Sequence, residues 1–133
     1  MKYALVPHRG GWQALAPTRL GVAYNAPLLV QFEPAHAGEL GRTFSALNVE
    51  PANVVVEAVK KADDSNELIV RLYETGGKAA DSVLSFNRAP QAARETDMLE
   101  WDKYVAPKSF VIEGTKVKLS VSPHEIKTIR VKF

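Results

Sequence analysis

Few side chains in this sequence have a type and spacing that could carry out acid–base, nucleophilic or metal chemistry. The three histidines, His8, His36 and His124, show neither the two-histidine helical spacing nor the His-x-Asp pattern of a metal site. Cysteine is absent, which excludes disulfides, thiolate metal ligands and cysteine nucleophiles. No Gly-x-Ser-x-Gly motif marks a nucleophilic serine. Residue types and spacing therefore predict no catalytic residue, no cofactor-binding residue and no metal ligand.

Two short motifs are similar to functional motifs, but the residues around them favour a simple turn in both cases. The sequence Gly76-Gly77-Lys78 is similar to the end of a phosphate-binding loop. However, Leu72 stands where that loop needs its first glycine, and Ala79 where it needs serine or threonine. We interpret the glycine pair as a turn. The pair Asp63-Asp64 lies in a polar cluster, where short carboxylates favour turn geometry.

Four residues remain as candidates for contact with a sugar or with a neighbouring domain: Trp12, Trp101, Arg71 and Glu74. A tryptophan on a β-sandwich can serve as a platform for a sugar ring. The simpler interpretation is that each indole covers the edge of the core or an interface with a neighbouring domain. Arg71 and Glu74 are expected on a central strand, where they most simply form a structural ion-pair or hydrogen-bond network. From such a strand they could also face a neighbour's cleft.

Length and composition are those of one soluble domain. The chain has 133 residues, of which 46% are hydrophobic and 24% are charged, so it can bury a core and is not of the disordered class. The longest nearly uncharged stretch, residues 20–32, is interrupted by Pro27. It is also shorter than the roughly 20 apolar residues that a membrane-spanning helix needs. We therefore expect no membrane span.

The hydrophobic pattern predicts an all-β fold, an antiparallel β-sandwich of short strands. Fifteen valines and turn residues at regular intervals favour strands over helices. Residues 54–60 and 68–74 flank a polar turn and are expected to form a hairpin. Further strands are expected over residues 80–86, 116–121 and 125–133, the last two joined by a turn at 122–124. Short strands at this spacing are typical of a sandwich or barrel.

Three places fit this pattern less well. Residues 13–25 could hold one short helix, and residues 90–100 could be either helix or strand. In the last strand, Ile126 has the opposite parity to the hydrophobic residues that follow it. This change of phase predicts a β-bulge near Lys127 or Thr128.

Positive charge is concentrated towards the end of the chain. The net charge is +2, but residues 108–133 alone carry six Lys or Arg against two Glu. Lys116 and Lys118 alternate with apolar residues, and so do Arg130 and Lys132, which is typical of strands with one solvated side. A basic segment indicates nucleic-acid binding only where its charges gather on one face. We therefore expect no nucleic-acid partner.

Five stretches in a fixed order cover nearly the whole chain. They are residues 5–12 (LVPHRGGW), 25–28 (NAPL), 47–77 with the Arg-x-x-Glu-x-x-Gly signature of Arg71, Glu74 and Gly77, 98–100 (MLE) and 123–130 (PHEIKTIR). Together these stretches resemble closing segments of the glycoside hydrolase family 38 α-mannosidases. The sequence departs from the family pattern at Val6, Asp97 and His124, where a tyrosine, an asparagine and an aromatic residue are common.

The resemblance implies that residues 1–133 are a single β-sandwich domain, the C-terminal part of a larger, retaining, metal-dependent α-mannosidase. In that family the metal ligands, the nucleophilic aspartate and the acid lie in earlier domains, so no catalytic residue is carried over to this sequence. The resemblance accordingly implies no cofactor in this chain. It implies a divalent metal, which we expect to be zinc, in the parent enzyme.

The role implied is accessory, with the catalytic domains of the same parent chain as the partner. Two alternatives remain open: a module that binds mannose or an oligosaccharide, and a structural oligomerisation domain of a parent enzyme that could be a homo-oligomer. The absence of cysteine, of an Asn-x-Ser/Thr acceptor and of a signal-like start favours a cytoplasmic location.

Overall fold

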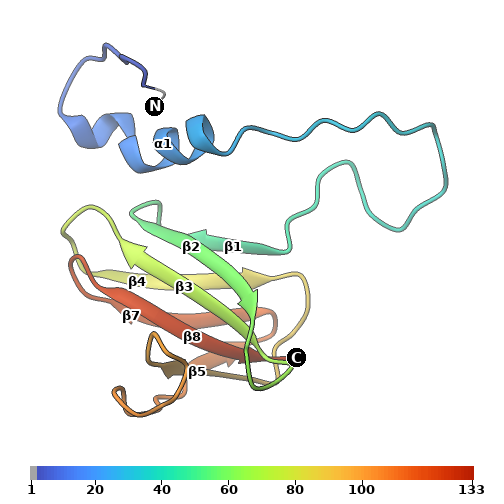
Figure 1. Ribbon diagram of the computed structural model, residues 1–133, viewed down its shortest axis with the longest axis vertical. Helices are drawn as coiled ribbons and strands as arrows, with labels where there is room; N and C mark the ends of the chain where they lie inside the picture. Colours follow the sequence, from blue (N-terminus) through green and yellow to red (C-terminus); the bar gives the residue numbers. More distant parts are fainter. Residues whose placement is uncertain (1–2) are drawn as a thin grey trace. The chain divides into compact units, whose positions relative to one another are not determined.

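The computed structural model describes residues 3–133 and divides into two units, Met1–Glu39 and Leu40–Phe133. Among the described residues, all eight strands lie in the second unit (Figure 1). The β-sandwich therefore begins at Leu47, and residues 3–39 contribute no strand to it. No helix within residues 3–133 is long and apolar enough to cross a membrane.

The first unit contains a short helix within residues 13–25, where the sequence allows one. A short 3-10 helix, η1 (Trp12–Leu15), is followed by α1 (Pro17–Asn25), with Ala16 in a left-handed conformation between them. Pro17 stands in the first helical turn, where its missing N–H costs no hydrogen bond. Neither helix contains a buried residue, so this unit has no core of its own among its helical residues.

The second unit is an antiparallel β-sandwich, which confirms the predicted fold class. One sheet has the strand order β1 (Leu47–Glu50), β4 (Ala80–Phe86), β7 (Lys116–Val121) and β6 (Val111–Glu113). The other has the order β2 (Val54–Lys61), β3 (Leu68–Glu74), β8 (Ile126–Lys132) and β5 (Ala92–Thr96). The ambiguous residues 90–100 thus contain a strand, and the predicted β2–β3 hairpin is present.

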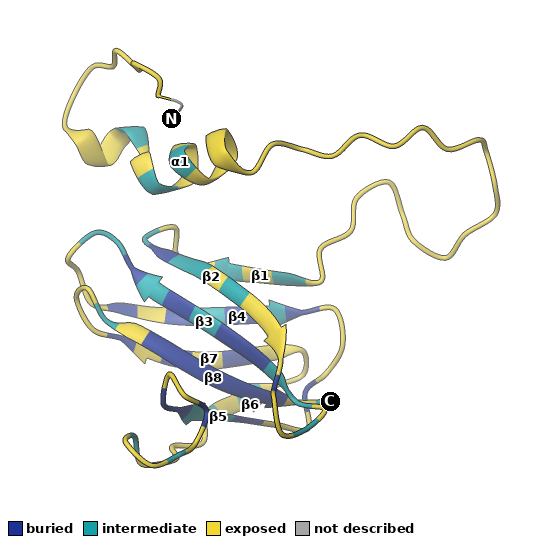
Figure 2. Cartoon of the chain, in the orientation of Figure 1, coloured by how far each residue is buried: buried dark blue, intermediate teal, exposed yellow. Residues whose placement is uncertain are grey.

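The inner faces of the two sheets form one hydrophobic core (Figure 2). Strict alternation on β7, with every second residue buried, places Lys116 and Lys118 in solvent as predicted. Most of the fully buried core side chains come from the interior strands β3, β4, β7 and β8, and Val54 comes from the edge strand β2; they are Val54, Val70, Leu72, Leu84, Val117, Ile129 and Val131. Burial of this apolar surface, at roughly 25 cal/mol per Å², is the main term that holds the sheets together.

Two sequence-based expectations about β8 are wrong. The turn at 122–124 does not close a hairpin, because β7 and β8 belong to different sheets. The predicted bulge near Lys127 or Thr128 is also absent, since β3 and β8 keep one continuous register from Leu68↔Val131 to Tyr73↔Ile126. Ile126 simply lies on the outer face of its sheet, where 59% of it is exposed. The irregular pairing is in β2 instead, between Val56 and Ala58.

Candidate functional site

Glu74 is a buried carboxylate at the end of β3 that binds three different turns. Its Oε1 accepts hydrogen bonds from Asn53 Nδ2 at 2.8 Å and from the Gly76 N–H at 2.6 Å. Its Oε2 accepts from the N–H groups of Gly77 at 2.7 Å and His124 at 3.0 Å. These donors come from the β1–β2, β3–β4 and β7–β8 connections. One carboxylate, only 2% exposed, therefore fixes three loops at the same end of the sandwich.

The electrostatics of this site favour the ionised carboxylate. Burial acts to raise the pKa of Glu74, but the hydrogen bonds from His124, Asn53, Gly76 and Gly77 outweigh it and lower the pKa to about 2. Gly77 has a φ of +67°, and a Cβ there would lie 2.9 Å from His124 Nε2. The glycine pair is thus a turn, as predicted, and its second glycine is required by both conformation and space.

Arg71 also lies on the interior strand β3, as predicted, but it belongs to a separate network. Its Nε donates to Thr128 Oγ1 at 3.3 Å, and its Nη2 donates to the Met98 carbonyl at 3.0 Å. Arg71 therefore joins β3 to β8 and to the loop after β5. The structure does not bring Arg71 and Glu74 together, since residues three apart on a strand point to opposite faces of the sheet.

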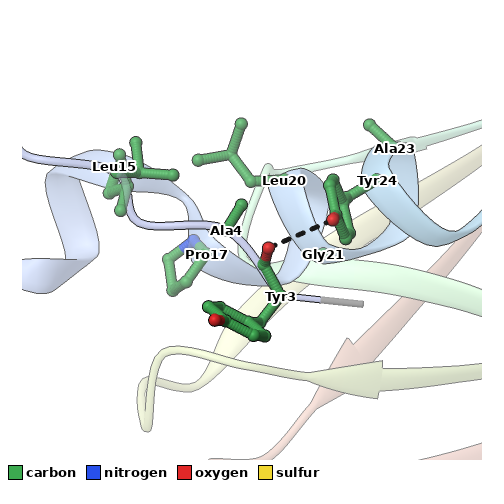
Figure 3. Close-up of a pocket in the computed structure, with 9 residues that line it drawn as sticks. Tyr3, Ala4, Leu15, Pro17, Leu20, Gly21, Ala23 and Tyr24 are labelled. Atoms are coloured by element: carbon green, nitrogen blue, oxygen red, sulfur yellow. Dashed lines mark hydrogen bonds between the residues drawn. The ribbon is translucent and has the colours of Figure 1, made fainter. Parts of the chain in front are cut away.

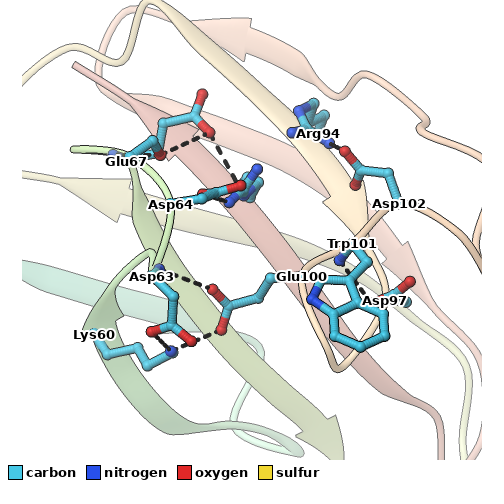
Figure 4. Close-up of polar contacts among 11 residues, drawn as sticks. Lys60, Asp63, Asp64, Glu67, Arg94, Asp97, Glu100, Trp101 and Asp102 are labelled. Carbon is cyan, nitrogen blue, oxygen red and sulfur yellow. Dashed lines mark hydrogen bonds and ion pairs between the residues drawn. The ribbon is translucent and has the colours of Figure 1, made fainter.

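The segment after β5, residues 97–104, is wrapped around a second buried carboxylate, Asp97 (Figure 4). Four backbone N–H groups donate to it within 2.9–3.1 Å, those of Leu99, Trp101, Lys103 and Tyr104. Burial acts to raise the pKa of Asp97, but these four hydrogen bonds prevail and lower it. We call residues 97–104 the Asp97 loop. Its conformation is set by one side chain.

Ion pairs attach the Asp97 loop to the sheet (Figure 4). The Glu100 carboxylate, in a residue only 7% exposed, contacts Lys60 Nζ at 2.8 Å and accepts a hydrogen bond from the Asp63 N–H at 3.4 Å. Asp102 pairs with Arg94 of β5. Asp63-Asp64 lies in a turn, as predicted, and this turn is also where the loop is held.

Arg130 was expected on the solvated side of β8, and this expectation is wrong. Its side chain is only 6% exposed, because the β2–β3 turn provides Asp64 and Glu67 as partners for the guanidinium. Arg130 also holds the pKa of Asp64 below its usual value. Lys127 is likewise withdrawn from solvent and pairs with Glu95 and Glu125, each at 2.9 Å.

The two tryptophans lie in different units. Trp12 is 56% exposed in η1, and Trp101 is 66% exposed on the Asp97 loop. Trp101 differs in that its own backbone N–H is bonded to Asp97 at 3.0 Å. Of the four candidate residues, Glu74 is thus buried, Arg71 is half-buried on the outer face of its sheet, and the indoles are exposed.

The Asp97 loop provides a direct test of what its carboxylate does. In Asp97→Asn the amide nitrogen cannot accept a hydrogen bond, so two of the four N–H donors lose their partner. We expect amide hydrogen exchange at Leu99, Trp101, Lys103 and Tyr104 to become about tenfold faster or more. Asp81→Asn, at an exposed position on β4, is the matched control and should change nothing. Unchanged exchange in the loop would contradict the role given to Asp97.

Within the residues that the structure describes, no group of three or more His, Asp or Glu side chains is placed to hold a metal ion. His8 and His36 hydrogen-bond only with backbone carbonyls next to them. The buried carboxylates at Glu74 and Asp97 already have four donors each. These carboxylates hold loops in place. Their oxygen atoms are already occupied as hydrogen-bond acceptors and are not open to a metal ion.

The sequence that forms this two-sheet antiparallel β-sandwich matches a known class of domain. Residues 53–129 match the model of the glycosyl hydrolases family 38 C-terminal beta sandwich domain. The chain therefore belongs to glycosyl hydrolase family 38. It corresponds to the C-terminal β-sandwich domain of that family's α-mannosidases.

Curated relatives match almost the whole chain. It is 31% identical over 130 residues to Alpha-mannosidase 2C1 of both Mus musculus and Homo sapiens. It is 28% identical over 134 aligned positions to Alpha-mannosidase G of Dictyostelium discoideum. In each case the match covers 96% of this chain and 12% of the relative. The chain thus spans about one eighth of the length of the curated proteins that it matches.

Proposed function

We propose that this chain is the non-catalytic C-terminal accessory domain of a retaining, metal-dependent α-mannosidase, where it packs against and supports the catalytic region. The observation that carries this proposal is the extent of the match. Nearly all of this chain aligns with only 12% of each α-mannosidase. The larger part of each relative lies outside the matched segment.

The geometry of the sandwich supports a mechanical role. Glu74 ties three turns to one end of the sandwich, and Asp97 with Glu100 holds a loop on the outer face of one sheet. Groups of this kind give a surface a fixed shape without taking part in a reaction. In the proposed enzyme, such a surface would hold neighbouring segments of the catalytic region in position.

The reaction itself is assigned to the catalytic region of the parent enzyme. There a divalent metal ion, which we expect to be zinc, would take part in hydrolysis of the α-mannosidic bond with retention of configuration. A cytoplasmic location completes the proposal. It is favoured by the absence of cysteine and of Asn-x-Ser/Thr acceptors in the printed sequence.

The test compares the α-mannosidase polypeptide with and without these 133 residues, using an aryl α-mannoside and added divalent metal. We expect the isolated chain to give no turnover. The catalytic region alone should lose thermal stability and activity, and regain both when the 133-residue chain is supplied. Clear turnover by the isolated chain would contradict the accessory role, and so would a catalytic region that is equally stable and active without it.

A second candidate function is sugar binding on the Asp97 loop. It is favoured by one observation: Trp101 is 66% exposed, yet its backbone is held by a buried carboxylate. An exposed indole on a fixed backbone is a suitable platform for a sugar ring, since the loop need not be ordered when the sugar binds.

Titration with mannose oligosaccharides, followed by tryptophan fluorescence, tests this candidate. If it is correct, the wild-type signal changes with sugar, Trp101→Ala abolishes the change and Trp12→Ala retains it. Trp12 is the matched control because its indole is similarly exposed but lies in the other unit. A flat response at millimolar sugar would eliminate this function.

A further inference from the structure

Residues 28–32 are a hydrophobic segment that nothing in the described part of the first unit covers. Leu28, Leu29, Val30 and Phe32 are between 93% and 99% exposed. These four side chains alone present a large apolar surface to water, and such surfaces mark interaction sites. The segment is bounded by Pro27 and Pro34, which limit it to the length of one short strand.

The order of the residues indicates which structure this segment adopts when it is covered. Leu28, Val30 and Phe32 occupy the even positions, whereas the odd positions hold apolar Leu29 and polar Gln31. On a strand these two sets face opposite sides. A strand with one wholly apolar face and one mixed face is typical of a sheet that packs one face against a core. Leu, Val and Phe at these positions fit such a strand.

The backbone of this segment is also unpaired. Among residues 3–39 of the first unit, none of the N–H or carbonyl groups of residues 28–32 hydrogen-bonds with another backbone group. When such a segment is buried, these groups must find partners, and a sheet edge provides them in one step. Hydrophobic exposure and unpaired backbone therefore point to the same event, addition of a strand to a sheet.

The helix next to this segment in the first unit has an uncovered apolar surface as well. Tyr3, Val6, Leu15, Leu20 and Tyr24 line an open hollow between α1 and the residues that precede it (Figure 3). Within it, Tyr24 Oη donates to the Tyr3 carbonyl at 3.2 Å. No residue of α1 is buried. The first unit thus holds its shape by local contacts and offers apolar surface to a partner.

We propose that residues 28–32 form a β-strand that pairs with an open sheet edge in the preceding part of the α-mannosidase polypeptide. This inference rests on the proposed function and names the segment by which the chain attaches. We infer that the partner is another part of the same polypeptide, because the match covers 96% of this chain but only 12% of each relative. A second copy of this segment fits less well, since two such strands paired alone would leave the apolar face of Leu28, Val30 and Phe32 in water.

Hydrogen exchange compares residues 28–32 in the 133-residue chain and in the longer α-mannosidase polypeptide that contains it. In the short chain these amides are expected to exchange without protection. In the long polypeptide, at least every second amide should be protected about 100-fold or more, as in a paired strand. Hydrogen exchange does not depend on enzyme turnover, so it tests the pairing of residues 28–32 separately from α-mannosidase activity.

A matched pair of variants tests the same inference in the long polypeptide. Val30→Asp places a charge inside the proposed strand, whereas Leu40→Asp places one at an exposed position outside it. Both should leave the short chain folded, because both side chains are exposed there. In the long polypeptide, Val30→Asp should remove the protection of residues 28–32, and Leu40→Asp should retain it.

Three other outcomes would contradict the strand, the partner named for it, or the proposed function. Stable association without protection of residues 28–32 contradicts the strand and leaves the accessory function intact. Protection in the short chain that increases with its concentration assigns the strand to a second copy and contradicts the occupant named here. A catalytic region that neither binds nor needs the 133 residues contradicts the proposed function, and the strand inference with it.

Discussion

Glu74→Gln is expected to lower the melting temperature of the sandwich by about 10 °C or more. The glutamine has nearly the same shape, but its amide nitrogen is a donor where the carboxylate oxygen was an acceptor. The N–H groups bound to Glu74 all donate, so two of them would face another donor inside a site that is 2% exposed. Thermal unfolding followed by circular dichroism measures the change.

Glu113→Gln is the matched control for this variant. Glu113 is also on a strand and pairs with Lys118, but its side chain is 57% exposed. Surface ion pairs contribute little, so we expect its melting temperature to stay within about 2 °C of the wild type. Equal effects of the two substitutions would show that the buried donors around Glu74 do not matter.

The same residue makes stability depend on pH in a defined window. The pKa of Glu74 is about 2 in the folded chain and 4.5 in the unfolded chain. A lowered pKa stabilises the fold above the unfolded value, and this contribution is lost as the pH falls through the folded value. Urea unfolding at pH 7, 4 and 2.5 should therefore show the difference between wild type and Glu74→Gln shrink as the pH falls from about 4.5 towards about 2. A difference that stays constant over this range contradicts the assignment.

Ile129→Ala is expected to destabilise the chain by roughly 2–5 kcal/mol, because it leaves a cavity at a fully buried position of β8. Urea unfolding at neutral pH measures this free energy. Ile126→Ala is the control on the same strand. Since Ile126 is 59% exposed on the outer face, its loss should be within about 0.5 kcal/mol.

This pair of variants also tests the register of β8. A bulge at Lys127 or Thr128 would turn Ile126 towards the core and make the two substitutions similar in cost. The continuous pairing with β3 predicts a large difference between them. Similar losses of stability would contradict the register described for these strands.

Strand positions could be read from the sequence because alternation is a local property. The ranges 68–74, 80–86 and 116–121 agree with β3, β4 and β7. The sheet to which each strand belongs is not local information. The turn after Val121 has the composition of a hairpin turn, yet it takes the chain from one sheet to the other.

The buried networks could be anticipated only in part. Arg71 and Glu74 were expected to have structural partners, and the family signature includes both. However, the Glu74 donors Asn53 and His124 are distant in sequence, and so are the Arg71 acceptors on Met98 and Thr128. Asp97 gives no side-chain signal, because its four donors are backbone N–H groups that every residue carries. The burial of Arg130 depends on the β2–β3 turn folding over it, which alternation along β8 does not encode.

The position of β8 has a consequence for how the chain is made. Among the described strands, β8 is synthesised last, and it lies between β3 and β5 inside its sheet. On the ribosome the β2–β3 hairpin can form early, but β3 keeps a bare edge until residues 126–132 emerge. Bare edges recruit other strands, so a stalled or shortened product is the form of this protein most prone to aggregate.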